Sequence, residues 1–105
     1  MKKISLRRTA EFDTWLSGLK DGLTKRRLAR RLEKVQNGNL GDVKPVGEGV
    51  LEMREHFSPG WRMYYTQRGE VLIVMLGGGD KSTQQADIEL AITLSKNLKD
   101  HNIYP

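Results

Sequence analysis

Side chains that could move protons or hold a phosphate group alternate along two neighbouring segments of this sequence. They occupy every second position: Glu52, Arg54 and His56 in the first segment, and Arg62, Tyr64 and Thr66 in the second. If the segments pair as a hairpin, all six side chains share one face of a sheet. Arginine binds phosphate oxygens through two parallel N–H bonds, and histidine exchanges a proton near neutral pH. The alternation therefore indicates either a phosphate-handling site or the solvated side of a half-covered sheet.

A second candidate is the glycine-rich junction of residues 77–82 (GGGDKS), between a predicted strand and a predicted helix. A nucleotide-binding loop requires glycine directly before its lysine, and Asp80 stands before Lys81 here. We therefore do not expect a nucleoside triphosphate site. A helix N-terminus with Lys81 beside it is still a reasonable anion site.

Composition narrows the class of protein. The 105 residues are 37% hydrophobic and 30% charged, which predicts one folded domain over residues 1–105. The lack of cysteine excludes disulfides and thiolate metal sites, and His56 and His101 have no ligand spacing between them. We therefore expect no metal and no cofactor. The basic N-terminus has no apolar stretch behind it and no run of about 18 apolar residues follows, so we expect a soluble, cytoplasmic protein.

The net charge of +5 is concentrated at the N-terminal end. Residues 1–38 hold 11 Lys/Arg and 4 Asp/Glu, a net of +7. Residues 39–81 hold 5 and 6, and residues 82–105 hold 2 and 3, a net of −1 each. A field of this sign favours a polyanion or an acidic partner protein.

Hydrophobic periodicity predicts the elements that position these residues. Residues 2–8 are expected to form an edge strand, and Thr9 to cap a helix with an apolar stripe: Phe12, Trp15, Leu16 and Leu19. A second helix is expected from Thr24 to Gln36, with Leu28, Leu32 and Val35 in line. At about 100° per residue, the opposite side of that helix is basic and exposed: Arg26, Arg27, Arg30, Arg31 and Lys34. The two helices form a hairpin with a basic outer face.

After the second helix, the period of the hydrophobic residues changes from 3.6 to 2. Residues 40–49 are expected to form a loop because glycine and proline punctuate them, and residues 50–57, 61–67 and 71–76 an antiparallel meander. A last helix starts at Ser82, whose capping box includes Gln85. The fold class is therefore α+β: an N-terminal helical hairpin packed on a small antiparallel sheet, with a C-terminal helix.

Three ordered segments resemble a known family. TAEFDTWLSGLKD, GNLGDVKPVGEGVLEMREHFSPGWRMYY and LIVMLGGGDKSTQQADIELA are similar to the "addiction module killer" group of HigB-like toxins, in the RelE/ParE superfamily. The resemblance covers about Thr9 to Leu94. It implies the RelE-like fold and a metal-independent, ribosome-dependent mRNA endonuclease that inhibits translation. It also implies a cytoplasmic helix-turn-helix (HigA-like) antitoxin as partner, with DNA contacted only through the toxin–antitoxin complex.

The resemblance also implies roles for individual residues. Arg62, the arginine of the GWR motif, is expected to clamp the phosphate, with Arg54 and Lys81 sharing the charge stabilisation. His56 is the expected proton carrier and Tyr64 an orienting or stacking group. RNA binding is expected at four further cations: Lys44, Arg27, Arg30 and Arg31. The superfamily often has a catalytic tyrosine or histidine near the C-terminus, where this chain has His101 and Tyr104.

Two alternatives remain at this stage. Some relatives with this fold, the ParE-like toxins, poison DNA gyrase and cut no RNA. The chain could also be a nuclease-inactive domain that binds nucleic acid or a partner protein through its basic helix face.

Overall fold

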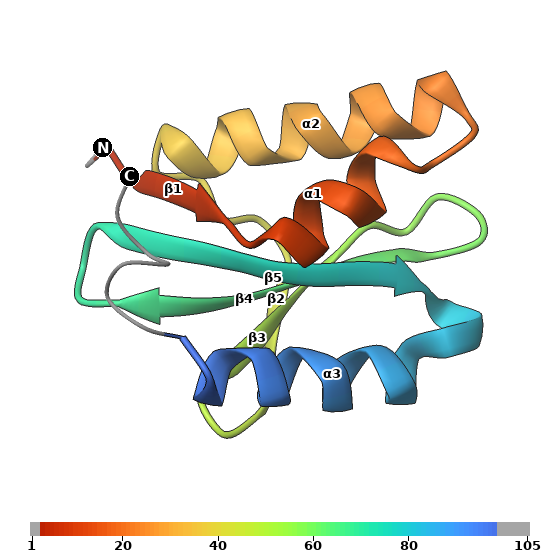
Figure 1. Ribbon diagram of the computed structural model, residues 1–105. Coiled ribbons are helices and arrows are strands. Elements are labelled where there is room, and N and C mark those ends of the chain that lie inside the picture. Colours follow the sequence, from red (N-terminus) through yellow and green to blue (C-terminus); the bar gives the residue numbers. More distant parts are fainter. Residues whose placement is uncertain (1–2, 99–105) are drawn as a thin grey trace.

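Strands and helices follow one another along residues 3–98, the part of the chain described by the computed structural model (Figure 1). The elements in chain order are β1 (Ser5–Arg8), α1 (Ala10–Ser17), α2 (Gly22–Gln36), β2 (Val43–Gly47), β3 (Val50–Arg54), β4 (Trp61–Arg68), β5 (Leu72–Asp80), a single 3-10 turn (Lys81–Thr83) and α3 (Gln84–Lys96). The strands form one sheet in the order β1-β5-β4-β3-β2. The predicted α+β class is confirmed.

The sheet lies between two helical layers (Figure 1). Helices α1 and α2 bury one face, where Phe12 and Leu28 pack with Met63 and Ile73. Helix α3 covers the other face, where Ala91 joins a second apolar cluster: Val50, Tyr64, Leu72, Val74 and Leu76. Because β5 is covered on both faces, its residues 72–76 are all buried, as an uninterrupted apolar run indicates. The face that carries the alternating polar residues is therefore solvated only toward its edge, because α3 lies over Glu52, Arg62 and Tyr64.

Both N-terminal helices begin at side chains that accept backbone N–H bonds. Thr9 accepts from the amide of Phe12 (3.1 Å), which confirms the predicted cap of α1. Asp21 accepts from the amide of Leu23 and the hydroxyl of Thr24 (2.7 Å), so α2 begins at Gly22, two residues earlier than predicted. These bonds satisfy amide groups that have no partner within the helix.

Two predictions about the sheet are wrong. It is mixed and not purely antiparallel, because β1 runs parallel to β5 after the chain returns through α1 and α2. Residues 40–49 are not simply a loop, since Val43–Gly47 is an edge strand that pairs with β3. Pro45 is compatible with an edge position, where its missing N–H breaks no ladder, and a bulge lies between Pro45 and Gly47.

The glycine-rich run continues β5 and does not form a strand-to-helix loop. A Cβ on Gly78 would lie 2.5 Å from the ring of Trp15 in α1, and one on Gly79 would collide with Asp87 in α3. Glycine at both positions lets a helix side chain approach the strand from each face. The capping box predicted at Ser82 is also wrong, because Asp80 accepts the Ser82 amide (2.8 Å) and α3 begins only at Gln84.

Between residues 3 and 98, no helix combines the length and the apolar character needed to cross a membrane.

Candidate functional site

Cross-strand register brings the alternating polar residues of β3 and β4 together. Arg54 lies directly opposite Arg62, and Glu52 lies opposite Tyr64. Lys44 on β2 is the partner of Glu52 on the other side, and is exposed at the edge of the sheet. Paired positions in a sheet point to the same face, so these five side chains belong to the face that α3 covers. The predicted alignment is confirmed for the residues from Glu52 to Arg54 and from Arg62 to Thr66, but β3 ends at Arg54 and His56 lies beyond the paired strands.

Glu52 is the centre of a buried hydrogen-bond network. Only 1% of the residue is exposed. Its Oε2 accepts a bond from the Tyr64 hydroxyl (3.1 Å) and one from Gln84 Nε2 (2.9 Å), while its Oε1 lies 3.7 Å from Arg62 Nε. The network ties the first residue of α3 to two strands. A buried carboxylate is costly without partners, so Glu52 needs the positive charge of Arg62. At the same time, Glu52 holds Arg62 in place.

Arg62 and Lys81 lie beside each other where β4 begins and β5 ends. Arg62 is 7% exposed, whereas Lys81 is exposed. A Cβ on Gly60 would lie 3.7 Å from Arg62 Nη1 and 3.6 Å from Lys81 Cβ, so both residues border the same point. Gly60 adopts a φ of +87°, a conformation that side chains rarely take. Glycine there keeps the space between the two cations free of a side chain.

His56 is linked to Arg54 through Asp42. It lies two residues beyond the end of β3, is exposed, and donates from Nε2 to Asp42 Oδ2 (2.6 Å). The same oxygen lies 3.8 Å from Arg54 Nε. The hydrogen bond from His56, together with the nearby charge of Arg54, lowers the pKa of Asp42 below its usual 3.8. His56 and Arg54 therefore share one carboxylate at the edge of the sheet.

Tyr64 does not present its ring to a ligand. The side chain is fully buried beneath α3, and its hydroxyl donates to Glu52. Burial, and then the negative charge of Glu52, raise the pKa of Tyr64 well above its usual 10.0. A stacking role is incompatible with this position, whereas an orienting role through Glu52 fits it.

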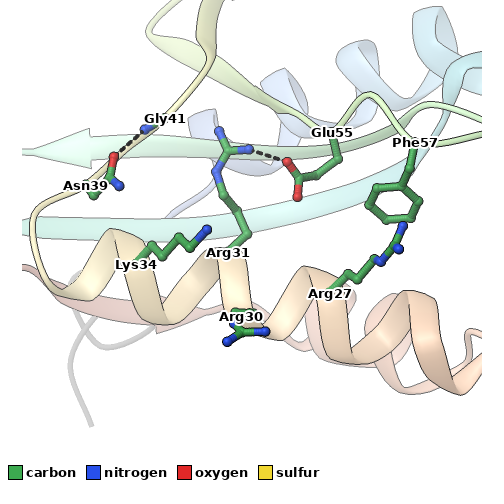
Figure 2. A pocket seen from close by; sticks show the side chains of 8 residues that line it. All are labelled: Arg27, Arg30, Arg31, Lys34, Asn39, Gly41, Glu55 and Phe57. Carbon is green, nitrogen blue, oxygen red and sulfur yellow. Dashed lines mark hydrogen bonds and ion pairs between the residues drawn. The ribbon is translucent and has the colours of Figure 1, made fainter.

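Helix α2 lines a groove of roughly 350 Å³ together with two loop segments (Figure 2). We call it the α2 groove; its lining residues are Arg27, Arg30, Arg31, Lys34, Asn39, Gly41, Glu55 and Phe57. Figure 2 shows Arg31 pointing toward Glu55 and Arg27 toward Phe57. The guanidinium of Arg27 lies over the Phe57 ring, 4.7 Å from its centroid.

The predicted position of Arg31 on the exposed basic face is wrong. The residue is 7% exposed, and Nη1 donates to Glu55 Oε2 (2.7 Å) and to the carbonyl of Arg54. Nε and Nη2 both donate to the carbonyl of Leu40, and Nη2 also to that of Asp42. All five N–H groups of a guanidinium are thereby used. Arg31 fixes the segment before β2 against β3, whereas Arg27 and Arg30 are exposed.

Helical spacing alone does not separate Arg31 from its neighbours. Its buried position depends on carbonyl groups contributed by residues 40, 42 and 54, which are distant in sequence. The same holds for two residues that the sequence pattern missed: Asp42, which pairs with His56, and Gln84, which donates to Glu52.

Metal binding finds no support in the described range, since no group of three or more His, Asp or Glu residues there could hold an ion. His101 and Tyr104, the C-terminal residues considered from the sequence, lie outside residues 3–98.

Comparison with known proteins places the chain in a family. The family model described as "Phage derived protein Gp49-like" matches residues 14–99. An uncharacterized protein from Haemophilus influenzae (strain ATCC 51907 / DSM 11121 / KW20 / Rd) is 41% identical over 95 residues, which cover 90% of this chain and 96% of that protein. The chain therefore belongs to the Gp49-like family of phage-derived proteins, a toxin-like family of the addiction-module type.

Proposed function

We propose that this protein is the toxin of a type II toxin–antitoxin pair and inhibits translation by cutting mRNA. The observation that carries the proposal is the pairing of Arg54 with Arg62 on one sheet face, with Lys81 beside Arg62. Like charges directly opposite each other destabilise a sheet, and here Glu52 and Asp42 each offset the charge of one arginine. The Nε atoms of both arginines are buried and make no hydrogen bond within the described residues. These Nε atoms face Glu52 and Asp42, so contact with the oxygens of a phosphodiester falls to the Nη groups of the two arginines.

The proposed chemistry is the metal-independent cleavage that the resemblance to HigB-like toxins implies. The ribose 2′-oxygen attacks the adjacent phosphorus, forms a cyclic phosphate and releases the 5′-oxygen of the next nucleotide. Arg62 holds the phosphate, while Arg54 and Lys81 stabilise the negative charge that develops on the phosphorane. One proton leaves the 2′-hydroxyl and one reaches the departing 5′-oxygen. His56, hydrogen-bonded to Asp42 beside Arg54, is our candidate for carrying a proton. Tyr64 acts indirectly, by orienting Glu52 against Arg62.

The toxin's partners follow from the same proposal. The substrate is mRNA on the ribosome, and a helix-turn-helix antitoxin neutralises the protein in the cytoplasm. Contact with DNA occurs only through that complex. The position of Lys44, exposed on β2 and opposite Glu52, suits a further contact to the RNA backbone.

One observation favours a second candidate function, a domain that binds nucleic acid or a partner without cutting. Glu52 already pairs with Arg62, and α3 covers the sheet face where Arg62 lies. A cation held in this way can serve the fold alone. The third possibility, poisoning of DNA gyrase, has no specific structural observation in its favour.

Primer extension on cellular transcripts after induction of the protein separates these functions. We expect new 5′ ends, and we expect Arg62→Ala and Lys81→Ala each to abolish them and the growth arrest. Arg68→Ala is the matched control, because Arg68 is an exposed cation at the other end of β4. Persistence of cleavage in the Arg62→Ala/Lys81→Ala double variant would falsify the site. Growth arrest with intact transcripts and a DNA-damage response would instead support gyrase poisoning.

A further inference from the structure

Helix α2 carries a charge distribution that works against its own stability. Its 15 residues include six Lys/Arg and a single acidic residue, Glu33. Like charges three and four residues apart repel each other on a helix surface, and Arg27, Arg30 and Lys34 have this spacing. The helix dipole favours a cation such as Lys34 in the last turn, but it does not explain the earlier arginines. An ordinary solvated face intersperses acidic residues, and this face has almost none.

The cations of the α2 groove differ in whether their charged groups already have ion-pair or hydrogen-bond partners. Arg31 is saturated by Glu55 and by three carbonyl groups. The side chains of Arg30 and Lys34 line the same groove and form no ion pair or hydrogen bond with any residue of the described range. Two exposed cations without a side-chain partner thus border the Arg31–Glu55 pair, whose charges offset each other.

The groove also contains an aromatic platform. Phe57 is partly buried against the core, and the Arg27 guanidinium lies over its ring. Proteins that bind single-stranded RNA combine cations along the backbone with aromatic rings or guanidinium planes against which a base can stack. Acidic peptides require the cations but have no use for a stacking surface. The presence of both features in one groove favours RNA.

The groove and the cluster of cations at the proposed phosphate site (Arg54, Arg62 and Lys81) lie on opposite faces of the sheet but meet at one edge. Arg54, the last residue of β3, faces the cluster, whereas Glu55, the residue after the strand, lines the groove. Asp42 and His56 lie at the edge between them, since Asp42 follows the groove segment and pairs with His56. A nucleic-acid strand that leaves the cluster at Arg54 can therefore reach the groove by crossing this edge.

We propose that the α2 groove is a second RNA-binding site, which holds single-stranded RNA with phosphates on Arg30 and Lys34 and a base against the Arg27–Phe57 pair. It extends the proposed function by assigning a path to the RNA that flanks the cleaved bond. The groove itself needs no cleavage chemistry, so binding can be tested separately.

The test uses a fluorescent 2′-O-methyl oligoribonucleotide of about 12 nucleotides, which matches typical single-strand site sizes and cannot be cut by 2′-hydroxyl attack. Binding to the full chain is followed by anisotropy over a range of salt concentrations. We expect Arg30→Gln/Lys34→Gln to weaken binding and to reduce the salt slope by about 1.4, from about 0.7 for each lost phosphate contact. Glutamine is a good helix former at both exposed positions, and circular dichroism verifies the fold.

The control variant, Lys20→Gln/Arg26→Gln, removes the same charge from exposed positions outside the groove. An equal effect of both double variants would show a non-specific charge effect and overturn the proposal. Phe57→Leu keeps an apolar contact with the core and is expected to weaken RNA binding at least about fivefold, but not the binding of an oligoglutamate peptide. If Phe57→Leu leaves RNA binding unchanged, or if oligoglutamate binds equally well, the groove is a site for acidic protein segments and the RNA assignment fails.

The outcome is independent of cleavage. If transcripts remain intact in cells and the oligonucleotide still binds through the groove, the proposed nuclease activity fails while the groove assignment stands. If new 5′ ends appear and Arg30→Gln/Lys34→Gln changes neither binding nor the salt slope, the groove assignment fails while the nuclease stands.

Discussion

The Nε atom of Arg62 lies 3.7 Å from Oε1 of Glu52, and both side chains are almost completely buried between the sheet and α3. The pair joins the strand that begins at the proposed phosphate site to the network of Tyr64 and Gln84. Removing one member of a buried ion pair leaves the other charged and without compensation. The stability of the fold and the position of the main cation are therefore coupled.

Because of this coupling, we expect Glu52→Gln to destabilise the fold. The amide keeps an acceptor for Tyr64 but loses the negative charge that faces Arg62, so we expect the free energy of unfolding to fall by about 1–3 kcal/mol. Urea unfolding measures it. The control is Glu48→Gln, which removes an exposed pair with Lys96 and should change stability by less than about 1 kcal/mol. Equal effects of the two variants would show that burial does not strengthen the Glu52–Arg62 pair.

Arg31 and Arg30 are neighbours in sequence, but we expect their substitution to change the free energy of unfolding by very different amounts. Arg31→Ala removes the partner of Glu55 and of three carbonyl groups, so it should cost about 3–5 kcal/mol. Arg30→Ala removes an exposed side chain and should stay within about 0.5 kcal/mol. Denaturant titration of both variants tests the difference. A small effect of Arg31→Ala would mean that the segment before β2 does not depend on this guanidinium.

The raised pKa of Tyr64 leads us to expect a loss of stability at alkaline pH. Burial raises the pKa of Tyr64 in the fold above its unfolded value of 10.0, so the stabilisation is complete below pH 10 and decreases as the pH rises above it. Burial also raises the pKa of Tyr65. Tyr64→Phe should make the decline shallower by up to one proton, about 1.4 kcal/mol per pH unit, as followed by unfolding at several pH values. Identical slopes in both proteins would contradict the buried position of the phenol.

The pKa of Asp42 depends on the position of His56. Since the hydrogen bond from His56 is the main cause of the lowered pKa of Asp42, His56→Ala should raise that pKa toward 3.8, as measured by NMR titration of the carboxyl carbon. The stabilisation from Asp42 is present above pH 3.8 and is lost as the pH falls through the lowered pKa. Asp80 is the internal control, because Ser82 and not His56 lowers its pKa. A parallel shift of both carboxyl groups would indicate a general effect and not a direct pair.

The local elements and the alignment of β3 with β4 could be predicted because they depend on nearby residues. Thr9 caps α1 through an amide three residues away, and the alternation of Arg54 and Arg62 follows from the pleat of two adjacent strands. The parallel pairing of β1 with β5 could not be predicted from local pattern, because those strands are more than 60 residues apart. The edge strand β2 was missed because glycine and proline there are equally typical of a loop.

By itself, the sequence determined the α+β class, the apolar stripes, the basic N-terminal half and the set of polar residues that share a sheet face, since these depend on residue type and spacing. Tertiary structure alone decided which cations are available. Arg31 and Arg62 are nearly buried and held by partners, whereas Arg30 and Lys81 are exposed. The physical reason is that the cost of burying a charge depends on carboxylates and carbonyl groups brought close by the fold, and sequence spacing does not record these.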